Sequence, residues 1–407
     1  MNILYIAYSC NPFAGSEDKI GWCVPYESSK TNKVIVITKE EQREPIEKYL
    51  ENHKLENVEF YYVDIPEFYK KIFKGFMYSG RLNVWNKRAF PVAKKICKDK
   101  KIDIIHQITP IEFRAIGNYG KIANTKFVCG PLGGGEFLPN GLKDYAKEHE
   151  IIEIVRSGIN YWYRFKLKVT RKINRCDYIM FANKETQEFL VGAELDCPHE
   201  LIFDNGLRSD ELVCWTEKEK CKNEKCVFLV AGRMIYRKGL DFLFDALVRI
   251  PQETRYQVRI VGDGPELEHL RRRCEDNLNL ANHVHCMGLI PYMEMEKEYA
   301  SANVFIMPSI RETTGTVLLE AMSKGIPVIT INKFGGATLF DENTGWLYGG
   351  NTKEEYIENL KKAILACIAN PDEVARRGEI ARKKAEKYTW QEKNKKYQKI
   401  YEKLLKK

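Results

Sequence analysis

The chain has 407 residues, of which 44% are hydrophobic and 12% are aromatic. This composition excludes a mainly disordered or low-complexity protein, and the length predicts two or three domains at about 150 residues each. Lys and Arg number 65 against 56 Asp and Glu, which gives a formal net charge of +9. Such an excess is compatible with a polyanionic ligand, a nucleic acid or an acidic membrane surface, and it does not distinguish among them.

The cysteines and the N-terminus predict a cytoplasmic chain. The twelve cysteines form no C-x-x-C pair and lie mostly in apolar runs, as reduced thiols do. Cys221 and Cys226 lack a second ligand pair, so no zinc site is expected there. Residues 1–8 are too short and uncharged for a signal peptide, and no stretch approaches the 18 apolar residues of a membrane span.

Short apolar runs alternate with amphipathic segments along the whole chain. The expected strands of the N-terminal half are 2–7, 33–37, 58–63, 102–105, 126–129, 178–182 and 200–203. Those of the C-terminal half are 226–231, 257–261, 283–287, 304–307 and 327–331, and helices are expected after Gly239 and at about 265–279, 293–301 and 316–324. Continuous apolar strands that alternate with helices predict parallel sheets covered on both faces.

The turn signal Asp204-Asn-Gly206 divides this pattern into two α/β domains, residues 1–205 and 206–389. The charged helix 390–407 is expected to pack back on the first domain. Since open parallel sheets bind ligands beyond the carboxyl ends of their strands, two such sheets are expected to face each other across a ligand-binding cleft.

The strongest motif follows the strand 304–307 and reads Arg311-Glu-Thr-Thr-Gly-Thr-Val-Leu-Leu-Glu320. A helix that opens at Gly315 and Thr316 presents free amides, which form an anion site. Glu320 then lies about 7 Å along the helix axis, where a carboxylate can accept both hydroxyls of a ribose. Acidic residues also suit helix N-termini without any ligand, and the spacing alone leaves both interpretations open.

A second motif, Gly232-Arg-Met-Ile-Tyr-Arg-Lys-Gly239, again joins a strand to a helix. Arg233 and Lys238 lie five residues apart across the loop, so both can reach one diphosphate. Fixed cations neutralise the charge that develops on a departing nucleoside diphosphate. Taken alone, the same residues are equally well explained as two solvated cations beside a glycine turn.

Together these motifs resemble the retaining nucleotide-sugar glycosyltransferases of family 4, which have a GT-B fold with two Rossmann-like domains. The resemblance covers nearly the whole chain and is most specific in residues 226–350. Thr313-Thr314 departs from the small or Gly residues that many members have there. Further matching segments are 262–266, 287–289, 308–312, 319–329, Gly335-Gly336 with Gly345, and, in the N-terminal half, 8–22, 106–110 and 130–136.

The resemblance implies a role for each matching residue. Arg233 and Lys238 would bind the donor diphosphate, Glu312 would contact the transferred sugar, and Glu320 would hold the ribose. The remaining donor-binding residues are expected to be Thr314, Gly315 and Thr316 at the helix start, Leu289 and Ile290 at the base, and Gly15 and Ser16 in the first domain.

His106 is expected to close the strand 102–106 and to contact the donor sugar or the acceptor at the cleft, as a family histidine does. A structural histidine at a strand end is the alternative. No D-x-D occurs in the chain, so neither a metal ion nor another cofactor is expected. The absence of a G-x-G-x-x-G after a strand weakens a dehydrogenase interpretation.

The positive charge is concentrated in two acid-free segments, residues 68–98 with nine Lys/Arg and residues 154–176 with seven. Both mix cations with aromatic side chains, which is typical of a surface that meets anionic lipid. Ordinary solvated helices whose aromatic residues pack inward are the alternative. Nucleic-acid binding is not expected, because no nucleic-acid motif is present.

The sequence therefore predicts a retaining, metal-independent hexosyltransferase that uses a nucleotide sugar, most readily a UDP-sugar. The expected acceptor is a saccharide or lipid-linked saccharide of a bacterial capsule or exopolysaccharide, at the inner face of the cell membrane. A GT-B-like epimerase, a phosphorylase, or a membrane-surface scaffold with a degenerate sugar site are the alternatives. The base, the sugar and the acceptor are not specified by the sequence.

Overall fold

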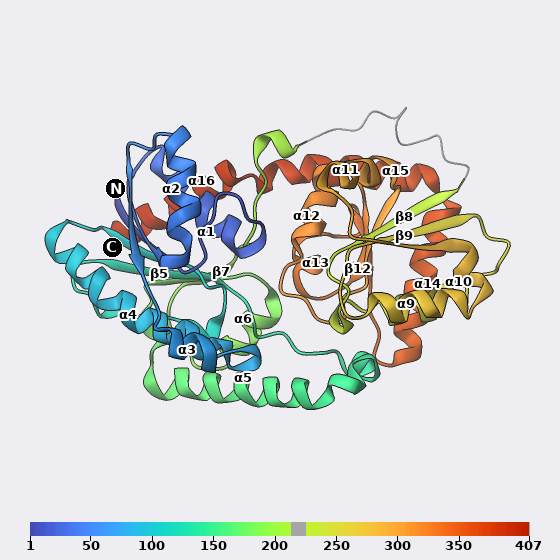
Figure 1. The fold of residues 1–407 in the computed structure, drawn as a ribbon, viewed down its shortest axis with the longest axis horizontal. Helices are drawn as coiled ribbons and strands as arrows, with labels where there is room; N and C mark the ends of the chain where they lie inside the picture. Colours follow the sequence, from blue (N-terminus) through green and yellow to red (C-terminus); the bar gives the residue numbers. More distant parts are fainter. Residues whose placement is uncertain (213–224, 407) are drawn as a thin grey trace. The chain divides into compact units, whose positions relative to one another are not determined.

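The computed structural model describes residues 1–212 and 225–406. The chain forms two compact units, each of which contains one parallel sheet (Figure 1). The first unit comprises residues 1–135, 154–206 and 390–407, and the second comprises residues 136–153 and 207–389.

The first unit has a seven-stranded sheet in the order β3-β2-β1-β4-β5-β6-β7, in which every pairing is parallel. The strand order reverses between β1 and β4, as in doubly wound sheets. The strands are β1 (Asn2–Ala7), β2 (Lys33–Lys39), β3 (Val58–Val63), β4 (Ile104–Thr109), β5 (Lys126–Leu132), β6 (Tyr178–Phe181) and β7 (His199–Leu201). The helices are α1 (Ser16–Ser29), α2 (Arg43–Asn52), α3 (Glu67–Ile72), α4 (Tyr78–Asp99), α5 (Glu150–Thr170), α6 (Lys184–Val191) and α16 (Trp390–Leu405).

The second unit has a six-stranded parallel sheet in the order β10-β9-β8-β11-β12-β13, which reverses between β8 and β11. Its strands are β8 (Cys226–Ala231), β9 (Tyr256–Val261), β10 (Val284–Gly288), β11 (Val304–Met307), β12 (Val328–Ile331) and β13 (Gly345–Tyr348). Its helices are α8 (Leu240–Leu247), α9 (Leu267–Glu275), α10 (Leu278–His283), α11 (Tyr292–Ser301), α12 (Thr316–Ser323), α13 (Phe334–Leu339), α14 (Lys353–Ala369) and α15 (Pro371–Ala385).

Both faces of the first sheet are buried, which explains the continuous apolar runs of its strands. Leu4 and Ile6 of β1 pack with Trp85 of α4 on one face. Ile3 and Tyr5 pack on the other face, with residues of α1 and α16. Since side chains alternate along a strand, a strand covered by helices on both sides must be apolar at every position. The predicted doubly wound α/β sheets are confirmed.

Several parts of the structure differ from the sequence prediction. Residues 136–153 belong to the second unit, because Leu142 and Ala146 are buried in its core. The helix expected at 265–279 is two helices, α9 and α10, since the Asn277 side chain caps a new helix start. The strand expected at 102–105 is β4 (Ile104–Thr109), so His106 lies inside the strand and not at its end.

Candidate functional site

The loops that follow β8, β9, β10 and β11 are joined by backbone hydrogen bonds at the carboxyl edge of the second sheet. The N–H of Gly232 donates to Val261 at 3.0 Å, and that of Gly262 donates to Gly288 at 2.8 Å. The N–H of Ile310 donates to Arg237 at 3.0 Å. The loops that follow neighbouring strands are therefore held together in one layer. This layer lies at the carboxyl edge, where open parallel sheets bind ligands.

The loop after β8 holds a group of cations. Arg233 is exposed, and no carboxylate of the residues that the structure describes pairs with it. A single 3-10 turn, Tyr236–Lys238, then leads to Gly239, whose φ is +68°. A Cβ on Gly239 would lie 2.2 Å from the Pro308 carbonyl oxygen, so only glycine allows this approach of the two loops.

Lys238 forms an ion pair with Glu312, which comes from the loop after β11. The Arg237 guanidinium lies 3.9 Å from the other carboxylate oxygen. Glu312 is only 9% exposed. Although burial opposes ionisation, Lys238 and Arg237 hold the pKa of Glu312 below its usual value, so it is a carboxylate at neutral pH. The structure thus brings together two predicted site residues that are 74 positions apart in sequence.

Beside this pair, α12 begins at Thr316 with Gly315 as its N-cap in the left-handed region, at φ +78°. A Cβ on Gly315 would lie 2.8 Å from the Met307 sulfur, and Thr314 before it is buried. The first amides of a helix have no intrahelical partner and favour anions. The predicted helix start is thereby confirmed, one turn before Glu320.

Glu320 lies on the second turn of α12, where its carboxylate accepts a hydrogen bond from the Tyr299 hydroxyl at 2.9 Å. Leu289, in the loop after β10, is 79% exposed, and Ile290 beside it is half-buried. Tyr299, Tyr236 and Arg237 were not predicted as site residues, because each makes its contact with a residue of another element or loop. The position of Arg237 next to Lys238 was the only available signal.

His106 is not placed as predicted, because it lies in the core of the first unit with no exposed surface. Its Nε2 donates to the Gly130 carbonyl at 2.8 Å, and its Nδ1 accepts from the Tyr401 hydroxyl at 2.6 Å. Burial lowers the pKa of His106 to about 3, so the ring is neutral. With both nitrogens occupied, the side chain has no atom left for a sugar or an acceptor, and its place is structural.

Gly15 and Ser16 lie exposed at the start of α1, at the carboxyl edge of the first sheet. Ser16 has a φ of 54°, a conformation that few residues other than glycine adopt. Next to them, the carboxylate of Glu17 accepts a hydrogen bond from the Ile111 N–H at 2.8 Å. Burial nevertheless raises the pKa of Glu17 to about 7, which makes it a titratable group near neutral pH.

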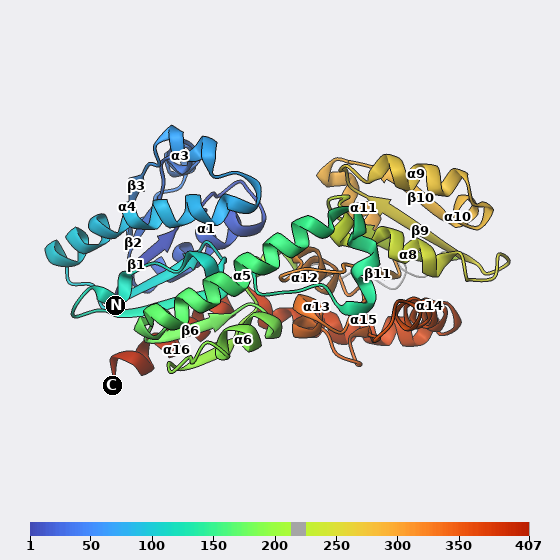
Figure 2. The same ribbon diagram turned by 90° about the horizontal axis from the view of Figure 1, so that it is seen from below.

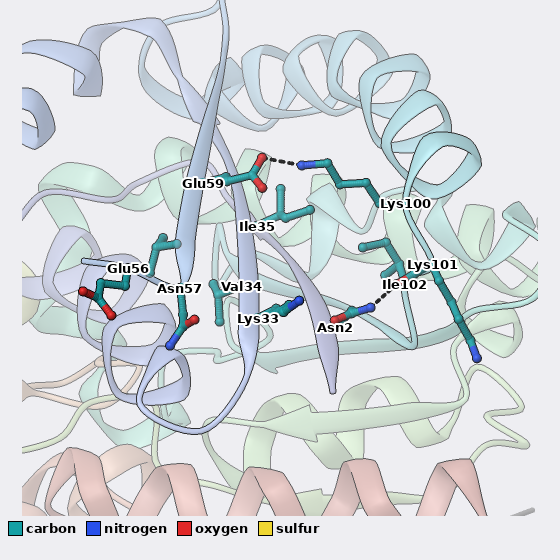
Figure 3. Close-up of a pocket in the computed structure, with 11 residues that line it drawn as sticks. Asn2, Lys33, Val34, Ile35, Glu56, Asn57, Glu59, Lys100, Lys101 and Ile102 are labelled. Carbon is teal, nitrogen blue, oxygen red and sulfur yellow. Dashed lines mark hydrogen bonds and ion pairs between the residues drawn. The ribbon is translucent and has the colours of Figure 1, made fainter. Parts of the chain in front are cut away.

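A surface pocket of about 390 Å³ lies at the opposite edge of the first sheet, where β1 and β2 begin (Figure 3). Lys33, Lys100 and Lys101 line it, and Lys100 pairs with Glu59 on its wall. This is the amino edge of the strands. The pocket therefore has no connection with the residues that the sequence singled out.

The two basic segments differ in their structure. Lys70, in the first of them, lies within 3.2 Å of three carboxylates, those of Glu41, Asp64 and Glu67, so its charge is already balanced. The second segment falls largely on α5. No helix within residues 1–212 and 225–406 is both long and apolar enough to cross a membrane, and these residues contain no cluster of His, Cys, Asp and Glu suited to a metal ion. Cys221 lies outside the described residues.

Comparison with known proteins identifies the class of this fold. The chain superposes on the crystal structure of Anabaena Alr3699/HepE in complex with UDP with a TM-score of 0.62, 17% identity and coverage of 99% of this chain and 100% of the other. Two Rossmann-like parallel-sheet domains are the GT-B fold of glycosyltransferases, as predicted.

Residues 215–384 match the model of the family "Glycosyl transferases group 1", and this range lies within the second unit. The sulfoquinovosyl transferase SQD2 of Arabidopsis thaliana is 31% identical over 171 residues, which cover 41% of this chain and 31% of that protein. The GDP-mannose-dependent alpha-(1-6)-phosphatidylinositol monomannoside mannosyltransferase of Mycolicibacterium smegmatis is 33% identical over 172 residues, which cover 39% of this chain and 43% of that one. The chain thus aligns with less than half the length of these curated relatives.

Proposed function

We propose that the protein transfers a hexosyl unit from a UDP-sugar to a hydroxyl of a saccharide or lipid-linked acceptor, with retention of configuration and without a metal ion. The observation that carries the proposal is the pair of half-buried Lys238 and buried Glu312, which lies at the same edge of the sheet as the exposed Arg233 and the N-terminus of α12. Cations, a helix mouth and an ionised carboxylate are what a diphosphate and a developing oxocarbenium ion require.

In this reaction Arg233, Lys238 and the amides of α12 neutralise the diphosphate. An ammonium has three N–H donors, so Lys238 can hold Glu312 and a phosphate oxygen together. The bond from the anomeric carbon to the diphosphate oxygen breaks, and the acceptor oxygen forms its bond on the same face of the sugar. The acceptor proton passes to the departing diphosphate, and Glu312 stabilises the positive charge on the ring. Glu320 holds the ribose.

A panel of nucleoside diphosphates and nucleotide sugars, screened by thermal shift and followed by transfer assays, tests the proposal. We expect UDP and a UDP-sugar to stabilise the protein most, and Arg233→Ala to lower turnover about 100-fold, since one transition-state donor contributes that much. Stabilisation by GDP alone would overturn the UDP assignment. Interconversion of sugar nucleotides without an acceptor would favour an epimerase, use of free phosphate would favour a phosphorylase, and binding to no nucleotide would leave a membrane-surface scaffold.

The membrane part of the proposal concerns the lipid-linked acceptor, of the kind found in a bacterial capsule or exopolysaccharide, at the inner face of the cell membrane. α5 runs as one long helix in the foreground of Figure 2. Ile154, Trp162, Phe165 and Val169 are each 58–64% exposed and follow helical spacing. Exposed cations accompany this stripe at Lys166, Lys168, Arg171 and Arg175. An apolar stripe with cations beside it suits the headgroup region of anionic lipid.

Flotation with anionic vesicles tests this surface. We expect the wild type to float with them, and the paired change Trp162→Ser with Phe165→Ser to abolish flotation. Leu278→Ser, which removes an equally exposed apolar residue (75%) from the second unit, is the matched control. Equal flotation of the paired variant, or no flotation of the wild type, would contradict membrane docking through α5.

A further inference from the structure

Glu153, in the first turn of α5, is a buried carboxylate without an assigned role, and it is only 8% exposed. Its Oε1 accepts the Tyr236 hydroxyl at 2.5 Å and an Arg311 N–H at 2.7 Å. The residue reaches these partners because residues 136–153 belong to the second unit. A buried charge with two charge-assisted partners is fixed more rigidly than a surface pair.

Both partners of Glu153 stand next to the proposed donor residues. Tyr236 is the first residue of the 3-10 turn that ends in Lys238. The His149 ring stacks on the Tyr236 ring, with 4.0 Å between the ring centroids. Arg311 immediately precedes Glu312. The Glu153 carboxylate therefore links the loop after β8, which carries Lys238, to the loop after β11, which carries Glu312.

The link made by Glu153 affects which cation pairs with Glu312. Lys238 and Arg237 already approach Glu312, and Arg311 is adjacent to it in the chain. A guanidinium binds a carboxylate through two parallel N–H bonds, which an ammonium cannot do, so an unpaired Arg311 would compete with Lys238 for Glu312. The buried Nε of Arg311 also has no hydrogen-bond partner among the residues that the structure describes. A buried donor without a partner is unfavourable, so a move of Arg311 toward Glu312 would gain a hydrogen bond.

We propose that Glu153 is a positioning residue of the donor site, which neutralises Arg311 and holds Tyr236, so that Lys238 and not Arg311 forms the close ion pair with Glu312. The inference rests on the proposed function for its consequence in catalysis. The arrangement of charges that it describes is measurable without any substrate.

The experiment measures the rate of Lys238 acylation by an amine-reactive reagent, followed by peptide mass spectrometry. In Glu153→Gln, which keeps the size of the side chain, Arg311 is released toward Glu312, and we expect Lys238 to react several-fold faster. In the double variant Glu153→Gln with Arg311→Met the competitor is gone, so the rate should return to that of Arg311→Met. The control is Glu150→Gln, an exposed carboxylate in the same turn of α5.

Turnover is measured on the same variants, together with the affinity for UDP by calorimetry. We expect kcat to fall about tenfold or more in Glu153→Gln, and to be partly restored by the added Arg311→Met, because removal of the competing cation repairs a charge defect but not a packing defect. An unchanged Lys238 rate in a folded Glu153→Gln would overturn the inference. Failure of the wild type to bind any nucleotide, with the Lys238 rates as expected, would overturn only the proposed function.

Discussion

The two sheets share a doubly wound topology, yet they differ in the charge state of the ionisable side chains in and beside them. In the second unit, Glu312 is buried as an ion and is neutralised by the half-buried Lys238. In the first unit, His106 is buried as a neutral ring between two polar partners, and Glu17 has a pKa near 7. The same scaffold thus supports either a neutral packed interior or a preorganised set of charges, and only the latter suits a charged ligand.

The largest expected effect comes from removing a charge in the second unit. Lys238→Met leaves Glu312 buried without its main cation and removes a diphosphate contact. We expect kcat to fall about 1,000-fold, since such donors contribute about 100- to 1,000-fold each. Lys297→Met, an exposed lysine of α11, is the control in the same steady-state assay. A loss below tenfold in a folded Lys238→Met would remove the contrast between the two units.

A substitution in the neutral interior of the first unit should lower the free energy of unfolding and leave turnover unchanged. His106→Phe removes the imidazole partner of the Tyr401 hydroxyl, which keeps a 3.4 Å contact with the Tyr5 hydroxyl, and the partner of the Gly130 carbonyl. This change costs about 2–4 kcal/mol of the free energy of unfolding. Urea denaturation measures this loss, and Tyr401→Phe should lose less. Turnover per folded molecule should stay within twofold of wild type. A stable His106→Phe with turnover lowered tenfold would instead return His106 to the active site.

The comparison of the two units shows which structural features sequence patterns predict and which they miss. β8 and β11 were predicted with their observed bounds, because buried parallel strands are continuous apolar runs. Strand β13 was missed, since Gly345-Trp-Leu-Tyr348 is short and contains no β-branched residue. His106 was misplaced because Tyr401, which occupies its Nδ1, lies 295 residues away. Contacts of that range leave no local pattern.

The same reasoning applies to the site. Glu312, Glu320 and Lys238 were predicted as site residues from their spacing relative to a strand or a helix start, taken together with the resemblance to a known family. Glu153 was not found, since its partners Tyr236 and Arg311 are 83 and 158 residues away. Motif spacing therefore indicates candidate ligand-binding residues, and only the folded chain shows which other residues hold those candidates in place.

A smaller effect is expected at Glu320. Glu320→Ala should raise the dissociation constant of UDP about tenfold, the equivalent of one hydrogen bond to a charged group, with a minor change in kcat. Calorimetry measures the affinity. Tyr299→Phe removes only the supporting hydroxyl of that carboxylate and should weaken binding less. Unchanged affinity in Glu320→Ala would separate this residue from the donor site.

The smallest effect concerns Glu17. Because its folded-state pKa is raised from 4.5 to about 7, ionisation is less favourable in the folded protein than in the unfolded one. The stability contribution of this group is therefore full below pH 4.5, declines as the pH rises toward 7, and then levels off. In Glu17→Gln the free energy of unfolding should fall by about 1 kcal/mol less over this pH range than in the wild type. The expected difference is small because solvent screens a partly exposed carboxyl. Melting temperatures of both proteins from pH 5 to 8 measure it, and parallel curves would contradict the shift.

The discontinuous course of the chain has a consequence for engineering. The polypeptide passes from one unit to the other after residues 135, 153, 206 and 389. A chimaera made by a single crossover near residue 206 would join two incomplete modules, one without α16 and the other without Leu142, Ala146 and Glu153. Exchange of specificity between homologues therefore requires residues 136–153 and 207–389 to be transplanted together.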